Sequence, residues 1–315
     1  MDAILSETDE KNVLPLENAA GIWYNKEKKR ERRADDMKDW MRIAAAVMLV
    51  AVLAGSLIYG VARRSPEVPE AVFLDVGEGS ATLIRTAAGS ILVDVGPENT
   101  QEKLVAHLKQ LGVRELALLV LTHPDEDHIG GADGILRAFP TREVWSNGEP
   151  AESDSYLAFL RAAEAVGLPV QVVSAGEGRE IGGVAVTVLS PAAESTGTQS
   201  ENENGLVLLV EAAGRRLLLM GDAGRETEAR LLTAMPDGLH ADILLAGHHG
   251  SDSAGSEAFL AAVAPETIVI SCGAGNASGH PDGRALERMR AVCGDIRRTD
   301  LAGDIRIGLS EKTER

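Results

Sequence analysis

The sequence predicts an α/β protein in which two β-sheets are sandwiched between helical layers, with one transmembrane helix ahead of them. Three observations predict it. Hydrophobic residues make up 44% of the chain and aromatic residues only 3%, so Leu, Val, Ile and Ala must build a buried core. Short apolar runs occur in two groups, each followed by helical patterns, as expected for two layered sheets. An uncharged run covers residues 43–62.

This uncharged run, IAAAVMLVAVLAGSLIYGVA, is long enough to cross a bilayer. At ~1.5 Å per residue, a helix of this length reaches roughly 30 Å, the thickness of the hydrocarbon core. A helix buried in a soluble protein would usually show a polar face, and this run offers only Ser56 and Tyr59. We therefore expect a transmembrane helix that contacts the lipid bilayer.

Basic residues around the run predict its orientation. Eight Lys and Arg residues lie between residues 26 and 42, whereas only Arg63 and Arg64 follow closely. The positive-inside rule then leaves the N-terminus in the cytoplasm and places the later chain outside the membrane. A cleaved signal peptide is the alternative, but the charged segment is longer than a usual n-region and no convincing A-x-A site follows. We expect an uncleaved, single-pass anchor in the cell membrane.

The other segments follow from composition. Residues 1–42 have mixed charge and are predicted to be a disordered cytoplasmic tail. Residues 63–70 are predicted to be a short extended linker, because Pro66 and Pro69 disfavour a helix. Residues 71–310 are expected to form one extracytoplasmic domain.

The first group of elements begins with apolar runs separated by glycines. Strands are predicted at residues 71–76, 81–86, 91–95 and 115–122. Amphipathic patterns predict helices at residues 101–112 and 154–167, the second with Leu157, Leu160 and Ala163 on one apolar face.

The second group follows the same order of strands and then helices. Strands are predicted at residues 184–190, 205–211, 215–221 and 241–247, with a helix at residues 225–235. A further helix, a strand at residues 267–271, a helix at residues 283–292 and a last pair of strands complete the domain.

The stretch THPDEDHIGG, residues 122–131, carries the strongest chemical signal. Within six positions it places four metal-type ligands: His123, Asp125, Asp127 and His128. Two carboxylates this close repel each other unless a cation is present. Because alternate residues of an extended turn point apart, His123 and Asp125 can face one ion, and Asp127 and His128 a second. Two ions about 3.5 to 4 Å apart also need a bridging carboxylate and further ligands.

Two other strand ends offer such ligands. Asp222 follows the predicted strand at residues 215–221, and His248 and His249 follow the one at residues 241–247. Alone, Asp222 would be equally typical of a turn or helix start, and the histidine pair would be more typical of a surface loop. Together with residues 122–131, they predict a dinuclear metal site at one rim of the sheets.

These motifs resemble those of the metallo-β-lactamase superfamily, in particular its ComEC-like competence hydrolases. The matching stretches are DVGEGSATLI, ILVDVG, THPDEDHIGG, NENGLVLLV, LLLMGDA, AGHHGS and GHPDGRALERM, in similar order and spacing. The resemblance covers about residues 70–310. It implies a four-layer αββα sandwich with the metals at the edge between the two sheets.

The resemblance also implies a ligand set. His123 and Asp125 would bind one metal, and the other would be bound by Asp127, His128 and His248, with Asp222 bridging the two. His249 stays open as the alternative to His248. Asp94 would orient the ligand loop from behind the metals. Asp127 would take part in catalysis, and His280 would hold a substrate phosphate or protonate a leaving group, unless it is simply part of a loop.

Two departures from the superfamily pattern affect the first metal. Asp125 stands where the superfamily has a second His, which makes the site richer in oxygen and suits Mn²⁺ as well as Zn²⁺. No histidine lies between His128 and His240, so the usual third His is missing and the first ion should be more open to water. Asn202 or Asn204 could approach that place, although the NENG run is more typical of a turn.

The implied reaction is hydrolysis, because two cations lower the pKa of a shared water and polarise the bond that it attacks. In this branch the expected bond is a phosphodiester, in one strand of incoming DNA outside the membrane. ComEC proteins have many membrane spans and this sequence shows one, so a channel would have to come from another polypeptide. The net charge of −17 argues against a broad nucleic-acid surface.

Two other function classes stay open. One is hydrolysis of a small or cell-surface substrate, such as a phosphorylcholine ester, a lactam or a lactone. The other is a non-catalytic metal-containing binding module, because Glu78 and Ser80 replace the Gln and Asp of the branch and Asp282 stands where it often has a second His. Cys272 and Cys293 could pair outside the membrane or stay as buried thiols.

Overall fold

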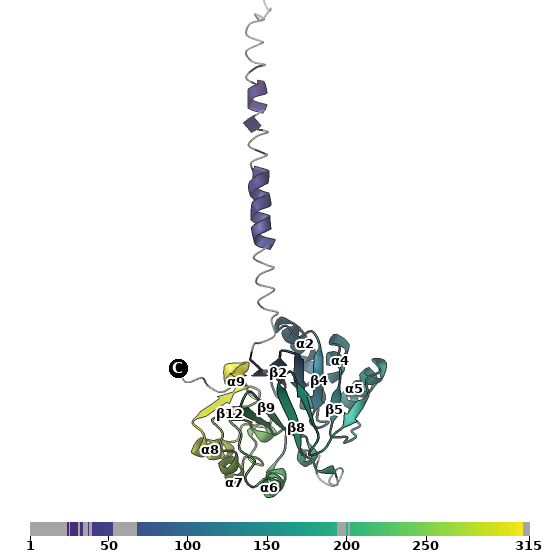
Figure 1. Cartoon of the computed structure of the whole chain (residues 1–315), viewed down its shortest axis with the longest axis vertical. Coiled ribbons are helices and arrows are strands. Elements are labelled where there is room, and N and C mark those ends of the chain that lie inside the picture. The colour runs from purple at the N-terminus through teal and green to yellow at the C-terminus, as the bar shows by residue number, and fades with distance from the viewer. Residues whose placement is uncertain are drawn as a thin grey trace, which may run out of the picture. The chain divides into compact units, whose positions relative to one another are not determined.

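The computed structural model describes Tyr24, residues 26–30, 32–33, Met37, 40–52, 68–193, Ser200 and residues 202–310. The chain forms two compact units, residues 1–62 and residues 63–315. The second unit contains both sheets (Figure 1). Every predicted metal ligand, from His123 to His248, belongs to this unit.

In the first unit, residues 40–52 form a helix. The described residues of the predicted tail are helical as well. Residues 53–62, half of the predicted membrane span, lie outside the described residues. Within the described parts of the chain, no helix combines the length and the hydropathy that a membrane crossing requires.

The first sheet of the described domain has the strand order β14-β1-β2-β3-β4-β5-β6. Its strands are β1 (Glu70–Phe73), β2 (Thr82–Thr86), β3 (Gly89–Val93), β4 (Leu116–Leu121), β5 (Val144–Ser146), β6 (Val170–Val172) and β14 (Ile305–Gly308). Strands β3 to β6 run parallel, so their carboxyl ends lie along one edge. Asp94 and His123 follow β3 and β4 at this edge.

The second sheet has the strand order β13-β12-β11-β10-β9-β8-β7. Its strands are β7 (Gly178–Ile181), β8 (Val184–Ser190), β9 (Val207–Ala212), β10 (Arg215–Leu219), β11 (Ile243–Leu245), β12 (Thr267–Ile270) and β13 (Asp295–Arg298). Strands β10 to β13 are parallel, and Asp222, the histidine pair and the His280 loop follow the carboxyl ends of β10, β11 and β12.

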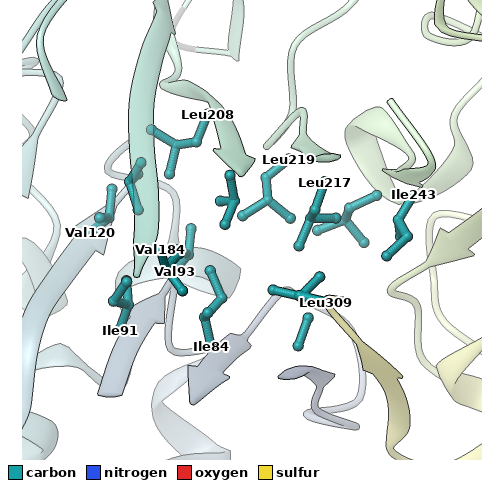
Figure 2. Close-up of a cluster of buried hydrophobic side chains, with 14 of the residues drawn as sticks. Ile84, Ile91, Val93, Val120, Val184, Leu208, Leu217, Leu219, Ile243 and Leu309 are labelled. Carbon is teal, nitrogen blue, oxygen red and sulfur yellow. The ribbon is translucent and has the colours of Figure 1, made fainter. Parts of the chain in front are cut away.

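Three apolar cores separate four layers. The core between the sheets receives side chains from both, including Ile84, Val120, Leu208 and Leu217 (Figure 2). A second core joins the first sheet to α2 (Gln101–Gln110), α4 (Ala132–Ala138) and α5 (Asp154–Ala165). A third joins the second sheet to α6 (Arg225–Ala234), α7 (Glu257–Val263) and α8 (Gly283–Val292). The predicted α/β architecture with two sheets between helices is confirmed.

Strand β4 shows why the apolar runs are continuous. Leu118 and Val120 point into the core between the sheets, whereas Leu119 and Leu121 point into the helix-side core. Successive side chains of a strand face opposite sides, and here both sides are covered. All six residues of the run LALLVL are therefore buried. The predicted ligand stretch follows directly after it.

Helix α5 buries a different face from the predicted one. Its buried residues are Ser155, Phe159, Ala162 and Ala163, while Leu157 and Leu160 are each 37% exposed. The prediction of a face with Leu157 and Leu160 is wrong, and only Ala163 was placed correctly. An aromatic ring buries more apolar area than a leucine, so the packing of Phe159 decides the rotation of the helix.

The last two strands join different sheets. Strand β13 pairs with β12 in the second sheet, whereas β14 returns to the first sheet beside β1. Leu309 N also donates to Pro69 O at 2.7 Å. The predicted last pair of strands exists, but its members do not pair with each other.

Candidate metal centre

The predicted ligand stretch lies where β4 ends and the short helix α3 (Glu126–Ile129) begins. His123 and His128 are buried, and the side chains of Asp125 and Asp127 are about a third exposed. His123 Nε2 lies 3.4 Å from Asp125 Oδ2, and His128 Nε2 lies 3.9 Å from Asp127 Oδ2. All four side chains therefore meet at one place.

The loop between β1 and β2 packs directly on this stretch. Ser80 N donates to Asp127 O at 3.1 Å. Gly79 has a φ of +137°, and a Cβ at this position would lie 2.3 Å from the Asp127 carbonyl oxygen. Only glycine permits this approach, so the DVGEGS segment positions the backbone that carries Asp127.

The proton positions on two histidines follow from their neighbours. Asp94 is 1% exposed, and its carboxylate accepts from Thr122 N at 2.8 Å and Thr122 Oγ1 at 2.9 Å. A carboxylate only accepts, so His128 Nδ1, 2.8 Å from Asp94 Oδ2, carries the proton. Thr122 Oγ1 donates to Asp94 and therefore accepts from His123 Nδ1 at 3.0 Å. Both imidazoles thus turn Nε2 toward the carboxylates, which is the orientation that metal ligation needs.

Asp222 lies between histidines of the two sheets, and its bridging of two metals stays a prediction. Its side chain is 4% exposed, and its Oδ1 lies 3.0 Å from His128 Nε2 and 3.4 Å from His249 Nε2. Its Oδ2 lies 3.6 Å from His248 Nε2. One buried carboxylate therefore reaches groups from both sheets.

The histidine pair occupies the short helix η4 (Gly247–Gly250), and its two side chains have different places. His249 is 8% exposed, its Nδ1 donates to Ser271 O at 2.9 Å, and its Nε2 lies 3.1 Å from Asp127 Oδ2. The side chain of His248 is 30% exposed and lies 3.3 Å from Ser253 Oγ. The prediction gave the second-site position to His248 with His249 as the alternative, and of the two it is His249 whose ring is buried beside Asp127.

Both residues of the pair have left-handed backbone, with φ of +49° at His248 and +54° at His249. Residues with a Cβ rarely adopt this region, and such strain persists where the surrounding contacts enforce it. His248 N donates to Gly221 O at 3.0 Å, and Ser251 N donates to His248 O at 2.8 Å. No propensity in the sequence HHG distinguishes the two histidines, so this backbone turn decides which one enters the cluster.

The electrostatics of the cluster favour charged side chains of both signs. Burial lowers the pKa of His128, but the carboxylates of Asp222 and Asp94 outweigh it and hold this pKa well above its ordinary value. Burial likewise lowers the pKa of His249, but Asp222 and Asp127 outweigh it and raise this pKa. Burial raises the pKa of Asp127, yet the hydrogen bond with His249 and the charge of His128 bring it down to about 2. When no cation is bound, the protonated imidazoles of His128 and His249 would therefore supply the positive charge that balances the carboxylates.

The same side chains fit divalent cations. Two sets bring their ligand atoms within 4.8 Å of one another: His123, His128 and Asp222, and Asp127, His128 and His249. Among the described residues, His123 Nε2 and Asp222 Oδ1 are buried atoms without a well-formed hydrogen bond. Buried polar atoms need a partner, and a cation would supply one to both.

These sets differ from the predicted pairs. His128 belongs to both sets, whereas the prediction assigned it to one ion with Asp127 and gave His123 and Asp125 to the other. Ligation by Asp125 and by His248 stays a prediction. The loop with Asn202 and Asn204 does approach His123, since a Cβ on Gly205 would lie 3.8 Å from His123 Cβ. The Asn204 amide, however, donates to Glu149 Oε1 at 2.8 Å.

A cavity of about 440 Å³ opens over the cluster. Its lining includes Asp125, Asp127, Asp222 and both residues of the histidine pair, and also the predicted catalytic residue His280. The His280 ring stacks on His249 with centroids 6.4 Å apart, and partial burial together with the charge of His248 lowers its pKa. Sequence reasoning missed one contact of the rim, in which Ser278 Oγ donates to Glu78 Oε1 at 2.7 Å.

The cysteines lie away from the cluster as free, buried thiols. Cys272 Sγ donates to Asp300 Oδ1 at 3.3 Å and Cys293 Sγ to Glu266 O at 3.3 Å. Of the two alternatives that the sequence leaves open, the structure has buried thiols.

Comparisons with known proteins agree with this geometry. The sequence model described as the Metallo-beta-lactamase superfamily matches residues 74–273. ComE operon protein 3 of Bacillus subtilis (strain 168) is 31% identical over 255 residues, 75% of this chain and 32% of that protein. Competence protein ComA of Neisseria gonorrhoeae is 33% identical over 265 residues, 82% of this chain and 35% of that protein.

Among solved structures, the metallo-beta-lactamase fold protein YhfI of Bacillus subtilis aligns with a TM-score of 0.51 at 11% identity. The alignment covers 76% of this chain and 99% of that one, and at this identity it concerns the fold alone. The chain spans about a third of the length of the two curated relatives.

Proposed function

Because this chain belongs to the metallo-β-lactamase superfamily and is similar to ComEC-like competence proteins, we propose that it is a metal-dependent phosphodiesterase. The observation that carries the proposal is the convergence of His123, His128, His249, Asp127 and Asp222 from both sheets on one cavity. Zinc and manganese are the metals to test, since the ligands are imidazoles and carboxylates.

The residues around the proposed metals have separate roles. Two cations at this site would supply an activated water and polarise the bond under attack. Asp94 and Thr122 fix the imidazoles, and Asp222 reaches the histidines of both sheets. His280 lies on the cavity wall with a lowered pKa, so near neutral pH its ring is uncharged and its N–H can donate to a phosphate oxygen.

We further propose that residues 43–62 anchor the chain in the cell membrane, with the catalytic domain outside the cytoplasm. The support is the uncharged run with basic residues ahead of it. Single-stranded DNA is the substrate to test first because one relative is named Competence protein ComA, and a membrane channel for it would be a separate partner. Protease added to intact cells should remove the domain, and its survival there would contradict this orientation.

The test of the activity measures metal content and hydrolysis of bis(p-nitrophenyl) phosphate with Zn²⁺ or Mn²⁺. Asp222→Asn and Asp127→Ala should each lower kcat/KM by about 10³-fold, because metal catalysis contributes several kcal/mol. Asp133→Asn is the matched control, since this carboxylate contacts Arg137 and Gln101 and does not line the cavity.

Two results would overturn the proposal. One is equal hydrolysis by wild type and Asp222→Asn, and the other is bound metal with no hydrolysis of any phosphodiester. A chromogenic lactam assayed in parallel identifies a lactamase, and inactivity with both substrates identifies a binding module.

A further inference from the structure

A group of arginines gathers beside the cavity, although the chain as a whole has a net charge of −17. Asp252 lies three residues beyond His249, and three guanidinium groups from two helices contact it. Arg288 Nη1 donates to Asp252 Oδ1 at 2.8 Å, and Arg284 Nη2 lies 2.8 Å from Asp252 Oδ2. Arg225 Nη2 donates to Asp252 O at 2.7 Å. Sequence reasoning could not see this group, because its members are far apart in the chain.

The three arginines differ in exposure and in their contacts. Arg288 has a side chain that is 16% exposed, and it also donates to Gly255 O at 2.7 Å and Ala254 O at 2.8 Å. It therefore fastens the loop behind the histidine pair to α8. Arg225 and Arg284 are 55% and 72% exposed, and they share the charge of Asp252 with Arg288. Asp282 lies 3.7 Å from Arg284. With Arg288 counted, three guanidinium groups face the two carboxylates of Asp252 and Asp282, so one positive charge is left in excess around the arginine patch (Arg225 and Arg284 on Asp252).

The arginine patch adjoins the metal centre through direct contacts. Ser253, next to Asp252, lies with its Oγ 3.3 Å from His248 Nδ1, and Arg225 N donates to Ser253 O at 3.0 Å. Asp282 N donates to Gly250 O at 2.9 Å and so joins the His280 loop to the histidine pair. His248 and His280 both line the cavity, with ring centroids 5.5 Å apart.

The cavity wall formed by the β1–β2 loop and α3 has the opposite charge. Glu78, Asp125 and Glu126 line it. Beyond Glu126, a neighbouring hollow of about 520 Å³ is lined by Asp125, Glu126 and Glu152 and by no basic residue. A chain of phosphates that left the cavity on this side would pass the carboxylates of Asp125, Glu126 and Glu152, and like charges at close range disfavour binding.

Resting on the proposed phosphodiester hydrolysis, we propose that Arg225 and Arg284 form a binding surface outside the cavity for the phosphate backbone of a single nucleic-acid strand. Arginine presents a planar set of donors that matches phosphate oxygens. Each exposed guanidinium has donors beyond those that Asp252 uses, so each can bind one backbone phosphate. The acidic wall then directs the strand to one side. Folding brings Arg225 and Arg284 together into a local basic surface, although the chain as a whole is acidic.

The binding experiment uses a fluorescent single-stranded oligodeoxythymidylate with the full chain in EDTA, where metal-dependent cleavage is absent. Anisotropy should show ~5-fold weaker binding for each of Arg225→Gln and Arg284→Gln, as expected for one exposed charge pair. The slope of log K against log salt should fall by ~0.7 for each arginine removed, because each releases fewer counterions from a single strand.

The matched control is Arg142→Gln. Arg142 is 58% exposed and pairs with one carboxylate, Glu115, ahead of β4 and β5 at the opposite edge of the sheet. It should bind the oligonucleotide like wild type. Equal binding by all variants, or equal weakening by the control, would overturn the proposal.

The kinetic experiment separates this inference from the proposed function. With metal, Arg225→Gln and Arg284→Gln should raise KM for the oligonucleotide and leave kcat/KM for bis(p-nitrophenyl) phosphate unchanged. If wild type cleaves the small ester but the variants keep the oligonucleotide KM, the inference fails and the proposed function stands. If wild type cleaves neither, the proposed function fails, and the EDTA binding data still decide on the arginine patch. Phosphatidylglycerol vesicles carry the same phosphate chemistry, so weaker binding to vesicles alone would contradict a nucleic-acid role.

Discussion

At the scale of single residues, the candidate site depends on which histidine nitrogens hold protons. Asp94 accepts three hydrogen bonds through its two oxygens, two from Thr122 and one from His128. Its backbone has a φ of +57°, a conformation that costs free energy for a residue with a Cβ. This cost is offset because the carboxylate fixes two imidazoles at once, one directly and one through Thr122 Oγ1.

Asp94→Asn should therefore weaken metal binding more than it weakens the fold. The amide group would face His128 Nδ1–H or Thr122 with a donor, which disturbs the tautomer that points the Nε2 lone pair at the cluster. Loss of such an outer partner typically lowers metal affinity about 10–100-fold. Competition with a chromophoric chelator measures this affinity. Asp242→Asn is the control, because Asp242 accepts from Arg216 N at 2.7 Å ahead of β11, and an equal loss there would contradict the assignment.

The two thiols should be unreactive in the folded chain. Burial is the main cause that raises the pKa of Cys272 to about 11, so almost no thiolate forms near pH 8. Cys293 is 5% exposed. Ellman's reagent should detect no thiol in the native protein and both after unfolding, since the thiolate is the reactive form. Rapid native labelling, or a missing thiol after unfolding, would contradict the buried, unpaired state.

Much of the site could be predicted at this scale, and the reason is local. His123, Asp125, Asp127 and His128 are neighbours in sequence, so their shared chemistry is visible before folding. Asp222 could be added because it ends a strand. The choice of His249 over His248 could not be predicted, since two left-handed residues in succession have no propensity signal. The arginine patch depends wholly on tertiary structure.

At the scale of elements, helix α5 shows how one aromatic side chain decides which face of a helix is turned toward the core. Ser153 Oγ accepts from Tyr156 N at 3.2 Å and fixes the first turn, and Phe159 is 1% exposed against the first sheet. Leu157 and Leu160 then point away from the core, although the spacing of the leucines predicted that they would face it. Periodicity predicted the helix correctly but not its orientation.

Substitutions on α5 test this orientation directly. Phe159→Ala should lower the free energy of unfolding by about 3–5 kcal/mol, because it removes a ring from a packed core. Leu160→Ala on the same helix should cost about 1 kcal/mol or less, since more than a third of that residue faces water. Urea unfolding followed by circular dichroism measures both. A larger loss for Leu160→Ala than for Phe159→Ala would mean that the predicted face is the buried one.

The strands that sequence analysis did not name are short or exposed. Strands β5 and β6 have three residues each, and β7 is exposed for most of its length. Too few residues alternate in such strands to give a periodic signal. They form because neighbouring strands offer hydrogen-bonding edges, which is a tertiary cause. The long buried strands β4 and β9 have apolar runs of their own and were predicted.

At the scale of the whole molecule, the two sheets hold opposite halves of one site. The first sheet supplies Asp94, His123 and the α3 residues, and the second supplies Asp222 and the histidine pair. Protons and cations compete for these groups. The stability of the domain should therefore depend on pH in opposite ways with and without metal.

In EDTA, the raised pKa of His128 adds stability below its unfolded value, and this stability is lost as pH rises through the folded value. Asp127, lowered from 3.8 to about 2, adds stability above 3.8 that is lost as pH falls toward 2. The free energy of unfolding without metal should thus decline above neutral pH, whereas with saturating Zn²⁺ or Mn²⁺ it should rise, because ligands must lose protons to bind. Urea titrations across pH measure both profiles. Identical profiles with and without metal would contradict cation binding by these residues.

The pairing of β1 with β14 means that the folded domain starts and finishes at adjacent positions, with Glu70 opposite Gly308. When the two ends of a domain lie side by side, the domain can be inserted into another polypeptide or circularly permuted with little distortion. A permutant that joins residue 309 to residue 69 and opens the exposed turn at Gly167 should refold with its metal affinity intact. The same topology explains how such a unit can serve as one module inside much longer relatives.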